Sequence, residues 1–296
     1  MSNPKIDLSL HKTPFYKSYK MEEFLDIYFY HPLGLVFAKI AYKAGLKPNH
    51  VSLLSMLIGV IGGIMLVSGK TALWGVAFIV FSSVLDSSDG QLARITGTSS
   101  LAGRVLDGLI GYAAFSAAYL AIAFNYLYQH AGAFWIFIIM LGAGFFSSVH
   151  SSMYDYYRTT FARITSGGTF VDKGDANELS GFFEKVYSTY DVYQNFFAAS
   201  HMRVLKFLDA KATNTALKEK IALMYEEHNL KNVHGWNMLG DNSKILGILF
   251  FVVLGREYWY FLYVIFFLTI IFIIMFFVQR ISDFKFLKKV EAEILK

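Results

Sequence analysis

Asp86-Ser-Ser-Asp-Gly-Gln-Leu-Ala-Arg94 carries two aspartates at the end of an apolar segment, and Gly103-Arg-Val-Leu-Asp107 follows after eight intervening residues. Asp86 and Asp89 are three residues apart, so one face of a helix carries both. Gly103 and Asp107 are four residues apart and share a face of the next helix in the same way. A short linker joins the two helices, which predicts antiparallel neighbours whose three carboxylates converge at one depth.

The composition places these carboxylates in a membrane protein. The chain has 296 residues, of which 55% are hydrophobic and 17% are charged, against about 25% charged in ordinary soluble domains. Cysteine is absent, which excludes disulfides, zinc–thiolate sites and thiol nucleophiles. The net charge of +5 does not indicate a nucleic-acid partner, because the positive residues flank apolar runs and form no stripe.

Apolar segments of about 20 residues, enough to cross a bilayer, predict an all-α integral membrane protein with a bundle of six transmembrane helices. An N-terminal amphipathic helix over 22–46 is expected to lie in the membrane interface. Polar composition and helical spacing from 151 to 243 predict a cytoplasmic helical insert. The six expected spans are 51–68, 72–94, 101–127, 133–149, 235–254 and 258–278.

These elements predict five regions along the chain. A cytoplasmic N-terminus with the interfacial helix is followed by four spans that carry the acidic motif, by the insert, by two more spans and by a cytoplasmic tail. The fifth span is expected to begin near residue 235 or, at the latest, at 244. The predicted boundaries are 1–46, 47–150, 151–243, 244–279 and 280–296.

The distribution of charge predicts the orientation. Residues 1–50 hold seven lysines against four acids, and the tail from Arg280 holds five basic residues against three acids. Basic residues accumulate on the cytoplasmic side of membrane proteins, so both termini are expected in the cytoplasm. An even number of spans agrees with that. The acidic end of the second span, and with it the active site, then lies at the cytoplasmic face.

Carboxylates inside apolar helices need compensation. An ionised group in a span costs a few kcal/mol on insertion scales, and three acids close together also repel one another. Divalent cations would resolve both problems, and carboxylate oxygens suit Mg²⁺, Mn²⁺ or Ca²⁺. Asp86, Asp89 and Asp107 are therefore predicted to hold divalent ions. The alternative is that these residues cap helix ends and face water.

The small and basic residues of the stretch fit either close helix packing or a flat bound ligand. Gly90, Ala93 and Gly103 would let helix backbones approach closely or leave a slot for a flat ligand. Arg94 could pair with a phosphate or with a motif carboxylate. These four residues are the candidates for substrate binding.

This pattern resembles the signature of the CDP-alcohol phosphotransferase family, D-x-x-D-G-x-x-A-R, eight residues, then G-x-x-x-D-x-x-x-D. The sequence matches it at seven positions with the family's gap: Asp86, Asp89, Gly90, Ala93, Arg94, Gly103 and Asp107. The resemblance is close over residues 45–150, weaker in the last two spans and absent from the insert. It implies a bundle of six spans and a site for two divalent ions, Mg²⁺ or Mn²⁺.

The last position of the pattern departs from the family. The fourth acid should stand at position 111, where this chain has Gly111. In the family that aspartate is thought to act as general base on the acceptor hydroxyl. Its loss leaves the catalytic base unassigned: another group or a water takes the proton, one metal site is weakened, or the protein no longer catalyses.

The resemblance implies transfer of a phosphoalcohol group from a CDP-linked donor, such as CDP-diacylglycerol, to an acceptor alcohol, with release of CMP. This reaction belongs to phospholipid headgroup synthesis. The alternative that Gly111 raises is a family member without catalysis that serves as a binding or partner subunit. A transporter that uses the acids is a third hypothesis, disfavoured because the acids lie near one membrane face and no inverted repeat is visible.

The acceptor is a small polar alcohol whose identity the residues leave open: inositol or inositol phosphate, glycerol phosphate, serine, choline or ethanolamine. A phosphorylated acceptor would need basic residues, and Arg104, Arg158 and Arg163 are the candidates, with ordinary interfacial arginines as the alternative. Gly59 and Gly63 form a G-x-x-x-G pattern in the first span. It fits either a homodimer or packing within the bundle.

Overall fold

The computed structural model describes residues 19–98, 101–170, 192–212 and 214–294, and gives the backbone alone for 19, 101–109 and 294. All regular structure in these residues is helical, which confirms the predicted all-α class. The membrane part is built from α2 (Pro48–Ile64), η3 (Met65–Val67), α3 (Gly69–Thr96), α4 (Leu101–Gln129), α5 (Trp135–Thr165), α10 (Trp259–Leu262), η5 (Tyr263–Leu268) and α11 (Thr269–Ile294). The remaining elements are η1 (Tyr19–Met21), η2 (Asp26–Tyr30), α1 (His31–Lys43), α7 (Ala199–Lys211), α8 (Thr215–Asn237) and α9 (Asp241–Val253).

Five helical segments in the described residues are long and apolar enough to cross a membrane. They are Pro48–Val67, Gly69–Thr96, Ile110–Gln129, Trp135–Thr165 and Trp259–Glu293. The predicted fifth span corresponds to α9, which has 13 residues. At 1.5 Å per residue it covers only about 20 Å of the roughly 30 Å hydrocarbon core. The sequence predicts six spans, and five helical segments of the described residues are long enough to cross a membrane; the short α9 accounts for the difference.

Glycines let α2 pack against both α3 and α4 with little space between the backbones. A Cβ placed on Gly62 would lie 2.7 Å from the carbonyl oxygen of Gly75 in α3. A Cβ on Gly63 would lie 2.7 Å from the backbone nitrogen of Ala118 and 2.8 Å from the carbonyl oxygen of Ala114, both in α4. A Cβ on Gly59 would likewise lie 2.7 Å from the Ser82 hydroxyl in α3, so both glycines of the G-x-x-x-G pattern make contacts within the bundle.

Replacing Gly63 by leucine is expected to destabilise the protein strongly. The atoms that a side chain at Gly63 would meet are backbone atoms, so the two helices would have to separate, and overpacking of a tight core costs about 1–3 kcal/mol or more. Gly144→Leu in α5 is the matched control, because nothing lies within 4 Å of a Cβ at Gly144. Thermal unfolding in detergent compares the two variants; equal midpoints would contradict the packing argument.

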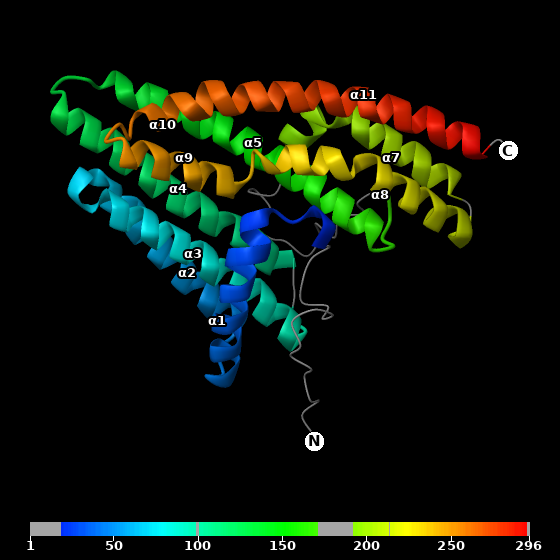
Figure 1. The fold of residues 1–296 in the computed structure, drawn as a ribbon, viewed down its shortest axis with the longest axis horizontal. Coiled ribbons are helices and arrows are strands. Elements are labelled where there is room, and N and C mark those ends of the chain that lie inside the picture. The colour runs from blue at the N-terminus through cyan, green and yellow to red at the C-terminus, as the bar shows by residue number, and fades with distance from the viewer. Residues whose placement is uncertain (1–18, 99–100, 171–191, 213, 295–296) are drawn as a thin grey trace.

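Two helices continue from the membrane part into a second helical layer (Figure 1). Helix α5 has 31 residues and is about 46 Å long, well beyond the hydrocarbon core. Its C-terminal half and that of α11 pack against α7 and α8 around a separate hydrophobic core. The predicted boundary at residue 151 thus falls inside α5, because the span and the insert share one uninterrupted helix.

The N-terminal segment is helical from residue 24 through α1, close to the predicted 22–46. Large apolar side chains of this helix, including Phe24, Val36 and Ile40, are exposed, as expected for a helix in contact with lipid. Its other face packs on α3: a Cβ on Gly34 would lie 2.9 Å from the Ser87 hydroxyl. The helix ends at Gly45, whose φ of +69° is the left-handed conformation that glycine favours.

Candidate functional site

The acidic motif occupies the last turns of α3. Asp89 is buried, with 6% of its surface exposed, and Asp86 is half-buried one turn earlier. A carboxylate this deep in an apolar helix requires a compensating partner or cation. Helix α3 ends at Gly97, whose φ of +66° closes the helix directly after the motif.

Arg94 lies over the glycine of the motif. A Cβ on Gly90 would lie 3.5 Å from Nη1 of Arg94. Because glycine has no side chain, the guanidinium of Arg94 can lie against the surface of α3 at this position. Ala93 and Arg94 are half-buried on the last turn. This arrangement places a permanent positive charge one turn from Asp89, where it could contact either a carboxylate or a phosphate.

The partner residues on α4 are placed by their backbone only. Gly103, Arg104 and Asp107 lie in the first turns of α4, within the residues whose side chains fall outside the description. The predicted convergence of Asp107 with Asp86 and Asp89 therefore stays a prediction. Within the described side chains no group of three acidic or histidine residues forms a metal site, and Asp107, the third predicted ligand, is not among them.

Position 111, one turn beyond Asp107 on α4, lies beside a carboxylate from another helix. A Cβ on Gly111 would lie 3.6 Å from Oδ2 of Asp241, the first residue of α9. The other oxygen, Oδ1, is 3.2 Å from Nζ of Lys244. The sequence alone does not indicate Asp241 as a site residue, since 130 residues separate it from Gly111 and it follows the polar insert.

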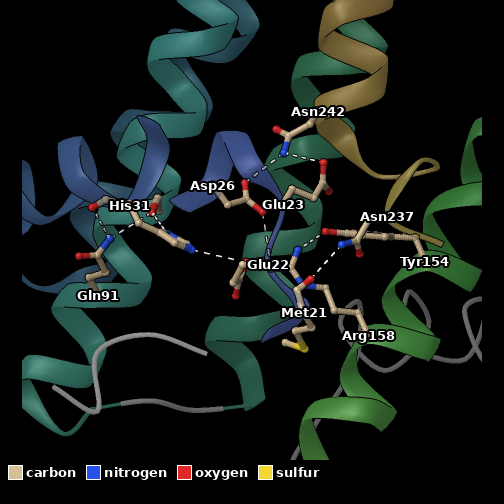
Figure 2. A network of polar contacts seen from close by, with 11 residues as sticks. Met21, Glu22, Glu23, Asp26, His31, Gln91, Tyr154, Arg158, Asn237 and Asn242 are labelled. Atoms are coloured by element: carbon tan, nitrogen blue, oxygen red, sulfur yellow. Dashed lines mark hydrogen bonds and ion pairs between the residues drawn. The ribbon is translucent and has the colours of Figure 1, made fainter. Parts of the chain in front are cut away.

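A buried polar network lies next to this site and is built by the N-terminal segment (Figure 2). The Glu22 side chain is 1% exposed; it accepts a hydrogen bond from Arg158 of α5 and lies 3.5 Å from Nε2 of His31. Asp26 is 3.7 Å from the same guanidinium. Asn242, which follows Asp241, donates to Glu23 and Asp26 over 2.9 and 3.1 Å. One arginine and three acids thus join η2, α5 and α9.

The same network reaches the motif helix α3. Nδ1 of His31 is 3.0 Å from the hydroxyl of Ser87. Gln91 donates to the carbonyl oxygen of His31 over 3.0 Å and to the Ser87 hydroxyl over 3.2 Å. Ser87 and Gln91 flank Asp89 in sequence. These hydrogen bonds from the N-terminal segment therefore fix which face of α3 points toward it.

The described arginines proposed for an acceptor phosphate have other partners. Arg158 is surrounded by Glu22 and Asp26. Arg163 donates to the carbonyl oxygens of Thr169 and Phe170 over 3.1 and 3.2 Å, which closes the loop after α5. Both guanidinium groups therefore have partners within the fold itself.

The two neighbouring glutamates respond oppositely to this environment. Burial alone raises the pKa of Glu22, but the hydrogen bond from His31 and the charge of Arg158 outweigh it and lower the pKa to about 2. Burial, aided by the charge of Asp26 and opposed by the Asn242 hydrogen bond, raises the pKa of Glu23 to about 7. Glu22 is thus ionised at neutral pH, whereas Glu23 keeps its proton to a higher pH than an ordinary glutamate.

Glu23→Gln is expected to flatten the pH dependence of stability. The folded parent holds a proton on Glu23 above the ordinary pKa of 4.5, so its stability falls as the pH rises through that value toward about 7. Glutamine keeps an oxygen for Asn242 and does not titrate. Unfolding midpoints of both proteins, measured from about pH 5 to about pH 8, should diverge in favour of the variant; parallel curves would contradict the assignment.

Residues 46–168 match the family model described as CDP-alcohol phosphatidyltransferase. Over these residues the chain is similar to that family. The match begins just before α2 and ends after α5, so it includes both motif helices and Gly111. Neither the curated proteins nor the solved structures contain a match to the chain. The family is one of transferases of substituted phosphate groups that act in phospholipid synthesis.

Proposed function

We propose that the protein transfers a phosphoalcohol group from a CDP-linked donor, such as CDP-diacylglycerol, to a small alcohol and releases CMP. The observation that carries the proposal is the family match over residues in which Asp89 is a buried carboxylate on an apolar span. Such a residue is hard to explain by helix capping, because a capping aspartate at a helix end would face water.

The residues of α3 and α4 have distinct roles in this proposal. Asp86, Asp89 and Asp107 would hold Mg²⁺ or Mn²⁺, for which hard carboxylate oxygens are suitable ligands. When bound, the ions would neutralise the pyrophosphate and stabilise the leaving phosphate. Gly90, Ala93 and Gly103 would leave room for the nucleotide, and Arg94 would orient a phosphate or carboxylate.

The charges around the site favour an acceptor without a phosphate. Arg158 and Arg163 are already occupied by carboxylates and by backbone carbonyls. Three neighbouring acids, Asp26 in η2, Glu23 shortly before it and Asp241 in α9, would repel an anion. Of the three arginines considered for an acceptor phosphate, only Arg104 has a side chain outside the description. A neutral polyol or an amino alcohol therefore fits better than a phosphorylated polyol.

We infer a cytoplasmic site with both termini on the same side, and α9 as a short sixth membrane helix. Met21 near the start of the described chain shares a hydrophobic core with Phe286 and Val290 near its end, so both belong to the same helical layer. Five full crossings would place them on opposite sides. The basic residues of both ends favour the cytoplasm.

An assay of CMP release tests the function. Purified protein in liposomes would receive Mg²⁺ or Mn²⁺, CDP-diacylglycerol and, one at a time, inositol, glycerol phosphate, serine, choline and ethanolamine. We expect metal-dependent CMP release with one unphosphorylated acceptor. Absence of CMP with every acceptor, and with CDP-choline and CDP-ethanolamine as alternative donors, would favour the second candidate, a non-catalytic binding subunit, which Gly111 supports.

A further inference from the structure

The glycine at position 111 leaves a gap that another helix partly fills. Gly111 is half-buried on the face of α4 one turn beyond Asp107. A side chain there would begin 3.6 Å from Oδ2 of Asp241, which is ordinary contact distance. An aspartate at 111 and the existing Asp241 would thus bring their carboxylates to almost the same place.

The carboxylate of Asp241 is accessible to a substrate, and an ion pair with Lys244 fixes its position. Its side chain is 57% exposed, whereas that of its partner Lys244 is 1% exposed. Lys244 also donates to the hydroxyl of Ser151 in α5 and lies over the ring of Phe115 in α4, 5.6 Å from its centroid. The buried lysine anchors one oxygen of Asp241 and leaves the other directed toward Gly111.

Helix α9 brings this carboxylate to the motif. It packs along α3, which carries Asp86 and Asp89, and it begins at Asp241 directly after the turn at Gly240. The next residue, Asn242, is held by Glu23 and Asp26. The start of α9 is thereby fixed from two sides, by the polar network and by Lys244.

We propose that Asp241 is the general base of this phosphotransferase, a carboxylate supplied by α9 in place of the acid that Gly111 lacks. The inference rests on the proposed function. The acceptor hydroxyl forms a bond from its oxygen to the β-phosphorus of the donor, the bond between that phosphorus and the oxygen of CMP breaks, and the hydroxyl proton passes to Asp241. General-base assistance of this kind contributes about 10²–10⁴-fold.

A purely structural role for Asp241 is the alternative that the experiment must separate. A buried lysine needs a counter-charge, and Asp241 supplies one to Lys244 over 3.2 Å. If the role is purely structural, removal of both charges together should restore both the folding and the activity of the protein. If Asp241 is the base, the double removal restores folding and leaves catalysis lost.

The test measures CMP release from CDP-diacylglycerol with the acceptor that the parent protein uses. Asp241→Asn is expected to lower kcat by about 10²-fold or more, while CDP-diacylglycerol with Mg²⁺ still raises its unfolding temperature as in the parent. Lys244→Met combined with Asp241→Asn should remain as inactive as Asp241→Asn. Asp209→Asn, an exposed aspartate in α7, is the matched control and should keep the parental rate.

Moving the carboxylate to α4 gives the decisive comparison. Gly111→Asp combined with Asp241→Asn should recover about tenfold or more over Asp241→Asn alone. Gly111→Asp alone should be no faster than the parent, because two carboxylates then repel at one place. An active Asp241→Asn protein, or an active Lys244→Met/Asp241→Asn protein, would overturn the assignment of the base. A parent that releases no CMP would instead overturn the proposed function, and a Gly111→Asp protein faster than the parent would show that the base was missing.

Discussion

Asp89→Asn should reduce CMP release by about 10³-fold or more and should also remove the stabilisation of the protein by Mg²⁺ or Mn²⁺. Asparagine has nearly the volume of aspartate but lacks its charge and one hard oxygen ligand, so the change isolates electrostatics from packing. A factor of 10³ corresponds to about 4 kcal/mol of transition-state stabilisation. Asp89 is expected to matter most because it is the more deeply buried of the two described motif acids.

Two measurements check this expectation independently. CMP release reports the chemistry, and the unfolding temperature with and without divalent ion reports the site even if the protein is not catalytic. Asp155→Asn is the control, since Asp155 is exposed on α5 and should keep both properties. If Asp89→Asn responds to Mg²⁺ as the parent does, the metal assignment on α3 is wrong, whatever the activity of the protein.

The sequence predicts the parts of the fold that depend on local pattern. Apolar length predicts the α-helical membrane part, and Pro48, which disfavours helix continuation from α1, is the first residue of α2. The spacing of Asp86 and Asp89 places both in the last turns of α3. These predictions succeed because helix periodicity and the cost of burying polar groups act over a few residues.

The rest depends on contacts between residues distant in sequence. Glu22 reads as the polar start of an interfacial helix, yet it is buried against Arg158, 136 residues away. Asp241 reads as the polar first half of a span, yet it lies beside Gly111. No periodicity indicates which charges meet. The sequence could indicate this contact only through two features taken together: the metal motif lacks an acid at Gly111, and a later helix begins with an acid, Asp241.

The buried network around Arg158 has a structural role that extends to the active site. It connects the N-terminal segment to α5 and α9 through Glu22, Asp26 and Asn242. Through His31 it continues to Ser87 on α3. Because the acids of the motif and Asp241 lie on two of these helices, the network sets the position of one relative to the other.

Arg158→Met is therefore expected to have the largest effect on stability among single charge removals, about 3–5 kcal/mol. Methionine preserves much of the apolar side chain, but Glu22 and Asp26 would lose their cation while Glu22 remains 1% exposed. Lys220→Met is the control: Lys220 and Glu293 form an ion pair with side chains 53% and 42% exposed, for which about 0–1 kcal/mol is expected. The unfolding midpoint in detergent should fall much further for Arg158→Met than for Lys220→Met. Similar midpoints would mean that the N-terminal acids are protonated or hydrated in solution, and the network would then no longer explain how α3 and α9 are aligned.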